Sequence, residues 1–268
     1  MKTSNKNILV LLDLNKKNDH VIDNTIKLAK DNCSSVEFLS VKSKLRLLKG
    51  DNQLSAKRQL NDELKAEHSI QRKIKELRSE CPSLSIKQTV TTGSPKATIK
   101  NHLKKNDYDV VVLGKRQVKP IHLFGNNVTK TVVSNYDGDL FITDSTNNLN
   151  QIENKSIGVL ERPSLTEVPS NPLEAIVKEK PVKRFRILGE KATLNADTSN
   201  EVVKGYEFEE NDKTFNTLSN YIKKDNVGVL CLAKPEKKNA RAKFNSDLNN
   251  AMKKFNCSLW ISNLDTAQ

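Results

Sequence analysis

Apolar and polar positions in the first half of the chain follow two periods in turn. Short runs of Val, Ile and Leu are typical of strands buried in a parallel sheet, and apolar residues three or four apart predict helices that cover it. The predicted strands are residues 7–14, 34–41, 84–90, 109–114 and 139–143. The predicted helices are residues 18–32, residues 53–80, a helix after Gly93-Ser94-Pro95 and one starting at Gly125-Asn126-Asn127. This α/β alternation predicts an open, mostly parallel five-stranded sheet flanked by helices.

The longest predicted helix, residues 53–80, is highly charged. Its apolar residues share one stripe and are Leu60, Leu64, Ile70, Ile74 and Leu77. We therefore expect this stripe to pack on the sheet and the remaining faces to be solvated. The next helix has Ser94 at its N-cap position and Pro95 in its first turn, where each residue type is favoured.

The same pattern restarts after residues 145–154, a polar segment with the composition of a linker. The later predicted strands are residues 155–161, 182–189, 202–208, 227–233 and 257–262. The later predicted helices are residues 211–225, residues 241–256 and a short one within 166–179. The sequence thus predicts two domains, at residues 1–147 and 153–268, each with a five-stranded sheet.

A candidate phosphate site follows the apolar strand at residues 109–114. Gly114 ends this strand, and Gly125 and Asn126 stand at the start of the next predicted helix. Free backbone N–H groups at a helix start and the carboxyl ends of parallel strands form a crevice that suits a phosphate. In the loop between them, Lys115 and Arg116 could hold an anion through their side chains. The alternative is that a Lys-rich chain places such residues on any exposed loop.

This order of strand, glycine, loop, Gly plus small polar residue, helix and strand resembles the C-terminal half of a universal stress protein domain. The helix start at Gly93-Ser94-Pro95 resembles the third helix of that family, and the resemblance covers about residues 5–145. The family pattern is Gly, two residues, Gly, nine residues, then Gly with Ser or Thr. Here Gln117 replaces the second glycine, seven residues precede Gly125, and Asn126 replaces the hydroxyl residue.

The resemblance implies a Rossmann-like fold of the adenine-nucleotide α-hydrolase type and a regulatory, stress-response function in a tandem two-domain form. It implies that Asp13 contacts the adenine or ribose of ATP and that Val41 contacts the adenine. The alternative for Asp13 is an ordinary loop or N-cap carboxylate. Because the phosphate loop departs from the family pattern, we expect ATP to be held weakly and more by side chains than by backbone.

The second half lacks the features of a nucleotide site. No glycine follows Gly228 in the strand at 227–233 or in the loop after it, and Pro235 in that loop has no N–H group. We therefore expect a degenerate, structural second domain. The short apolar strands at residues 139–143 and 258–262 are expected to pair, as universal stress proteins commonly do, and so to form an intramolecular pseudo-dimer.

Composition and motifs narrow the function further. The net charge of +13 permits contacts with nucleic acid, but basic and acidic residues are interleaved and aromatics are only 5% of the chain, so nucleic-acid binding is not expected. The four cysteines form no C-x-x-C pair, and buried thiols are expected. With no spanning stretch and no signal-peptide core, we expect a cytoplasmic protein without membrane contact.

Motifs for catalysis and metal binding are missing from the sequence. The four histidines are scattered, and neither a nucleophile elbow nor a His-Glu-x-x-His helix nor a P-loop is present. We therefore expect no catalytic residue, no metal site and no enzymatic activity. Three alternatives remain open: a protein-interaction module without a small ligand, an α-hydrolase-type enzyme, and a nucleic-acid binder.

Overall fold

The computed structural model describes residues 6–14, 17–32, 35–42, 53–115, 127–146, 149, 154–162, 181–188, 205–235 and 241–263. Its contacts divide the chain into two compact units, unit 1 (Met1–Gly138) and unit 2 (Asp139–Gln268). The structure thus groups the strand that starts at Asp139 with the second unit, whereas the sequence assigned it to the first domain. The predicted domain limits at 147 and 153 stay a prediction.

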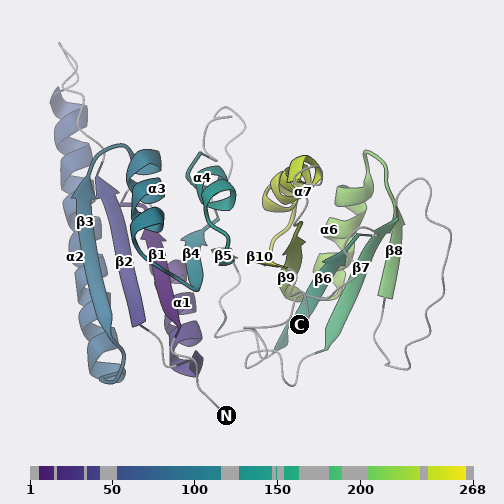
Figure 1. Cartoon of the computed structure of the whole chain (residues 1–268), viewed down its shortest axis with the longest axis horizontal. Helices are drawn as coiled ribbons and strands as arrows, with labels where there is room; N and C mark the ends of the chain where they lie inside the picture. Colours follow the sequence, from purple (N-terminus) through teal and green to yellow (C-terminus); the bar gives the residue numbers. More distant parts are fainter. Residues whose placement is uncertain are drawn as a thin grey trace. The chain divides into compact units, whose positions relative to one another are not determined.

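Unit 1 contains parallel strands in the order β3-β2-β1-β4 (Figure 1). Its strands are β1 (Asn7–Leu12), β2 (Ser35–Lys42), β3 (Ile86–Thr92) and β4 (Val110–Gly114). Its helices are α1 (Asp19–Asn32), α2 (Gln53–Glu80), α3 (Pro95–Lys105) and α4 (Asn127–Asn135). Ion pairs join α1 to α2, and α3 contacts α4, as expected when right-handed crossovers place the two pairs on opposite faces.

The central strands of unit 1 are buried on both sides, which explains their continuous apolar sequence. Leu9 and Val10 of β1 and Val111 and Val112 of β4 are fully buried. Strands covered on both faces need apolar residues at every position instead of an alternating pattern. The predicted α/β class, a mostly parallel sheet flanked by helices, is therefore confirmed.

The predicted apolar stripe of α2 is only partly buried. Ile70, Ile74 and Leu77 are buried, but Leu60 and Leu64 are 42% and 41% exposed, so that part of the prediction is wrong. A helix of 28 residues is about 42 Å long, whereas the eight residues of β2 span about 26 Å. Lys42, the last residue of β2, pairs with Glu67 at 2.6 Å, so residues before Glu67 lie beyond the strand end. None of the helices that the structure describes is long and apolar enough to cross a membrane.

The start of α3 follows the prediction in sequence but not in every contact. Ser94 occupies the N-cap position with extended backbone angles, φ −76° and ψ 118°, and Pro95 is the first helical residue. The Ser94 hydroxyl makes no capping hydrogen bond, so the predicted side-chain cap is wrong. Its carbonyl instead accepts the Thr98 N–H at 2.9 Å, an ordinary first helical bond.

Unit 2 repeats this strand order. Its strands run β5-β10-β9-β6-β7-β8, and β8-β7-β6-β9 corresponds to β3-β2-β1-β4 of unit 1 (Figure 1). The strands are β5 (Asp139–Thr143), β6 (Ser156–Glu161), β7 (Val182–Leu188), β8 (Gly205–Glu209), β9 (Val227–Lys234) and β10 (Ser258–Asn263). The helices are α6 (Thr214–Lys224) and α7 (Arg241–Lys254), and the helix predicted within 166–179 lies outside the described residues.

The two terminal strands β5 and β10 pair antiparallel, as the sequence predicted. Trp260 lies opposite Phe141, flanked by the pairs Leu259 with Ile142 and Ile261 with Leu140. The Phe141 and Trp260 rings contact each other, with centroids 5.4 Å apart. The pairing of the two strands is confirmed, and the pseudo-dimer arrangement of two whole domains stays a prediction.

The cysteines agree only in part with the expected buried thiols. Cys231 and Cys257 are buried in unit 2, and burial raises the pKa of the Cys231 thiol to about 12. Cys81, just after α2, is half-exposed, so the prediction is wrong for this residue. Cys33 lies outside the described residues.

Candidate functional site

The carboxyl ends of β1, β2 and β4 bring four of the predicted site residues together. In the parallel register Leu11 pairs with Leu113, and Leu12 pairs with Ser40. Residues one or two positions further along these strands therefore lie next to each other, and they are Asp13, Val41, Gly114 and Lys115. This edge is where open α/β sheets bind their ligands.

The loop after β1 is held in place by Asn18. Its side-chain oxygen accepts the Asp13 N–H at 3.2 Å, and its amide donates to the Asp13 carbonyl at 3.0 Å. Its own carbonyl accepts the N–H groups of Val21 and Ile22, so Asn18 lies at the start of α1. Asp13 itself precedes Asn18 by five residues and is not at the N-cap position, which leaves its half-buried carboxyl at the sheet edge.

Gly114 is required by a close contact and not by an unusual backbone conformation. Its φ lies outside the left-handed region, and a Cβ atom there would come within 3.0 Å of the Val21 Cγ2 atom. The same Cβ would lie 3.3 Å from Nε2 of His20. Glycine is therefore needed because the first turn of α1 approaches the end of β4 closely.

The same contact places His20 at the candidate site, which the sequence did not predict. It belongs to the first turn of α1 and faces Gly114 at the candidate edge. The signal in the sequence was its place shortly after Asp13, since a helix that follows the first strand starts at this edge of the sheet.

Three predicted phosphate contacts, Arg116, Gly125 and Asn126, lie outside the described residues. The helix expected after them is present as α4, which starts at Asn127. These three assignments stay predictions. Among the residues that the structure describes, no group of three or more His, Cys, Asp and Glu side chains is placed to hold a metal ion.

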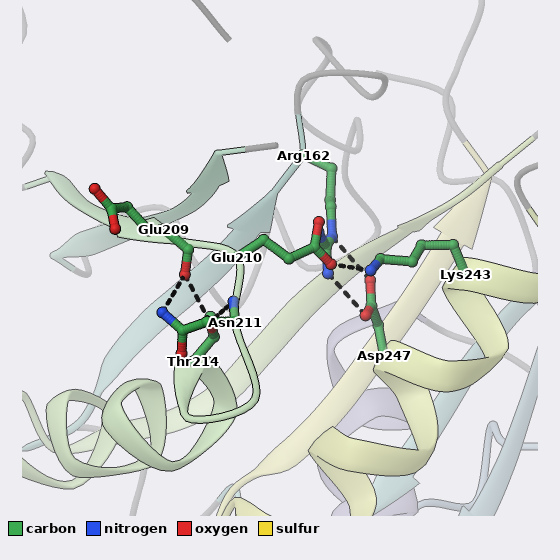
Figure 2. A network of polar contacts seen from close by, with 7 residues as sticks. All are labelled: Arg162, Glu209, Glu210, Asn211, Thr214, Lys243 and Asp247. Atoms are coloured by element: carbon green, nitrogen blue, oxygen red, sulfur yellow. Dashed lines mark hydrogen bonds and ion pairs between the residues drawn. The ribbon is translucent and has the colours of Figure 1, made fainter. Parts of the chain in front are cut away.

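The corresponding edge of unit 2 is filled by charged side chains. Arg162 directly follows β6, as Asp13 follows β1, and donates two hydrogen bonds to Asp247 of α7, at 2.9 and 2.8 Å. Arg162 also pairs with Glu210 at 2.9 Å, and Lys243 pairs with the same carboxylate (Figure 2). We call these four residues the Arg162 cluster. No sequence pattern predicted this cluster, because its members are far apart in the chain.

Glu161, the last residue of β6, is also paired within unit 2. It accepts a hydrogen bond from Arg184 of β7 at 2.5 Å and contacts Arg186 at 3.3 Å. Arg186 in turn contacts Glu207 of β8 at 3.3 Å. Alternating charges thus cross three neighbouring strands at this edge, and Arg184 and Arg186 of β7 already have acidic partners.

Unit 1 has a polar cluster of its own, which surrounds a carboxylate inside the apolar strand β2. Glu37 accepts hydrogen bonds from Thr89 at 2.6 Å, Tyr108 at 2.8 Å and Lys87 at 3.3 Å. Nε2 of His102 lies 3.2 Å from Oε1 of Glu37, the oxygen that also accepts the Thr89 hydrogen bond. Burial favours the neutral carboxyl, but these hydrogen bonds outweigh it, so the pKa of Glu37 lies below its ordinary value.

We expect Glu37→Gln to destabilise unit 1 by about 2 kcal/mol at neutral pH, because hydrogen bonds to a charged acceptor are lost. A lowered pKa stabilises the folded state above the unfolded pKa, and this stability is lost as pH falls through the folded pKa. The difference between wild type and variant should therefore shrink below about pH 4. Hydrogen exchange of the β2 and β3 amides measures it, with the exposed Glu76→Gln as control. An equal, pH-independent effect of both variants would contradict the role of Glu37.

The family model of the universal stress proteins matches residues 4–143. No curated protein matches the sequence significantly. A universal stress protein from Archaeoglobus fulgidus DSM 4304 is similar in structure, with a TM-score of 0.70, 11% identity and 98% of each chain covered. A functionally unknown protein from Pseudomonas aeruginosa PAO1 has a TM-score of 0.56 and 11% identity, covering 98% of this chain and 94% of that one. At such identities the two structures show the fold alone.

Proposed function

Because this chain belongs to the universal stress protein family, we propose that it is a regulatory, stress-response protein whose unit 1 binds an adenine nucleotide weakly. The observation that carries the proposal is the meeting of Asp13, Val41 and Gly114 at the carboxyl ends of three neighbouring parallel strands. Ligands of open α/β sheets bind at such an edge. The proposed role is binding and not catalysis.

The charges at this edge suit a nucleotide. Lys115 follows Gly114 directly, and Arg116 is its neighbour in sequence. A flexible ammonium and a guanidinium fork both bind phosphate oxygens well. A carboxylate at Asp13 is suited to accept hydrogen bonds from a ribose or adenine, so the two ends of a nucleotide would have separate partners.

We further propose a tandem architecture in which unit 2 binds no nucleotide. Its strands repeat the order of unit 1, which supports a tandem origin. At its edge, however, Arg162 stands in the place of Asp13, and its guanidinium is directed at Asp247 and Glu210. The expected stoichiometry is therefore one nucleotide per chain.

Calorimetric titration with ATP tests the proposal through the double substitution Lys115→Ala, Arg116→Ala. We expect the double variant to bind ATP about 2 kcal/mol more weakly, since each charge-assisted contact contributes roughly 1 kcal/mol or more. The effect should decrease with added salt, because salt screens these charges. The matched control is Lys104→Ala, Lys105→Ala, which removes the same charge from the exposed end of α3.

Three outcomes of this titration would change the proposal. Tight binding that the double substitution leaves unchanged would indicate a backbone cradle for the phosphates. Equal weakening by the control pair would indicate a general effect of net charge. No heat with wild type, and no nucleotide in mass spectrometry of the gently purified protein, would favour a protein-interaction module without a small ligand.

A further inference from the structure

The Arg162 cluster has one member that is fixed and buried. Asp247 is 6% exposed, lies on α7, and uses both carboxylate oxygens to bind the Arg162 guanidinium. Such a two-point contact defines the orientation of a planar guanidinium. The contact with Asp247 uses Nε and Nη2 of Arg162. The second terminal nitrogen, Nη1, is directed toward Glu210. Asp247 therefore fixes the orientation of the Arg162 guanidinium and also neutralises its charge.

Within the Arg162 cluster, the Glu210 carboxylate lies between two cations, as a bound anion would. One of its oxygens contacts Nη1 of Arg162 at 2.9 Å, and the other contacts the ammonium of Lys243 (Figure 2). Its side chain is 30% exposed and Lys243 is 53% exposed, so this half of the cluster opens to solvent. A carboxylate held between two cations in this way occupies the position that an anionic ligand would take.

The segment that carries Glu210 is held in place on both sides. The Glu210 N–H donates to the Leu188 carbonyl at 3.2 Å. Thr214 binds the residues on both sides of Glu210. Its hydroxyl donates to the Glu209 carbonyl at 2.6 Å and accepts the Asn211 N–H at 2.8 Å (Figure 2). The backbone at Glu210 is therefore fixed by contacts that do not involve its carboxylate.

Charge within the cluster is balanced only while Glu210 is present. Arg162 and Lys243 carry two positive charges, and Asp247 and Glu210 carry two negative ones. If Glu210 is removed, Lys243 and Nη1 of Arg162 remain without their shared carboxylate, and the cluster has an excess of one positive charge. The orientation of Arg162 does not depend on Glu210, because Asp247 still binds its guanidinium.

We propose that Arg162 and Lys243 form a second anion site of the chain, which Glu210 keeps closed by occupying it as an internal anion. The ligand class is inorganic phosphate or a phosphate monoester, since these offer several oxygens to a guanidinium and an ammonium at once. The site lies wholly in unit 2 and does not depend on nucleotide binding by unit 1. It also gives a physical role to the two basic residues at this edge of unit 2.

The test is to open the site with Glu210→Ala and to add inorganic phosphate at constant ionic strength. A ligand that binds only the folded state raises the unfolding midpoint, and Trp260, the only tryptophan of the chain, reports on unit 2. We expect Glu210→Ala to bind phosphate at least about tenfold more tightly than wild type, the effect of removing a competing charged contact. Phosphate should thus raise the midpoint of this variant more than that of wild type.

Two further variants make the result decisive. Glu209→Ala removes the same charge one residue earlier, where the carboxylate points away from the cluster (Figure 2). It should behave like wild type. Adding Lys243→Gln to Glu210→Ala should abolish the gain, and because Lys243 is exposed this change should leave the fold intact. If phosphate shifts the midpoint equally in wild type, Glu209→Ala and Glu210→Ala, or if the gain persists without Lys243, the proposed site does not exist.

Discussion

Replacing Arg162 with Gln should destabilise unit 2 by about 3–5 kcal/mol, the usual effect of removing one partner of a buried ion pair. The substitution leaves the buried Asp247 carboxylate without its bidentate partner. Burial raises the pKa of Asp247, and Arg162 opposes that rise. Urea unfolding followed by Trp260 fluorescence measures the loss, because the single tryptophan lies in unit 2.

The pH dependence of this variant separates an unpaired charge from lost packing. Without Arg162 the folded pKa of Asp247 should lie further above its unfolded value, so the protonated form stabilises the fold and this stability is lost as pH rises. The defect should therefore be smaller in acid than at neutral pH. Adding Asp247→Asn should recover part of the loss at neutral pH, and Arg186→Gln on an exposed strand position should cost no more than about 1 kcal/mol. An equal effect of Arg162→Gln and Arg186→Gln would contradict the importance of the buried pair.

Trp260→Ala is the second substitution for which we expect a large loss, about 3–5 kcal/mol. Trp260 is 2% exposed and packs against Phe141 across the β5–β10 pair. Truncation would leave a cavity beneath two strands that meet edge to edge. Because the variant has no tryptophan, its unfolding by urea is followed by circular dichroism.

Trp260→Phe is the matched control for this cavity. The indole Nε1 atom is buried and has no hydrogen-bond partner among the residues that the structure describes. Phe keeps most of the ring volume and removes that polar atom, so its cost should be clearly smaller than that of Ala. If both variants lose the same stability, the cavity is not the cause of the loss.

Much of the fold could be predicted from apolar periodicity alone. The central strands β1, β4 and β9 are short and almost entirely apolar, and α2 occupies the predicted residues 53–80. What the pattern could not show is how far α2 extends beyond the sheet, since helix length relative to strand length decides that. Leu60 and Leu64 therefore match the stripe in sequence but not in burial.

The candidate site was predictable where it depends on strand ends and not where it depends on pairs of distant residues. Asp13, Val41 and Gly114 meet because parallel strands of one sheet end at one edge. The partnership of Arg162 with Asp247 joins residues 85 positions apart, and no local pattern encodes it. The partners of Glu37 were hidden in the same way, because they come from β3, from α3 and from Tyr108 between α3 and β4.

The pairing of β5 with β10 decides where the gene can be divided for study of the second half. A fragment that starts at residue 153 would lack β5 and would present the bare backbone edge of β10, with apolar residues on both sides of it. Unpaired apolar edges recruit strands from other molecules, so such a fragment is prone to aggregate. A fragment that starts at Asp139 retains the strand that protects this edge, and it also keeps the Asp144 N–H bonded to the Ser258 hydroxyl at 2.9 Å.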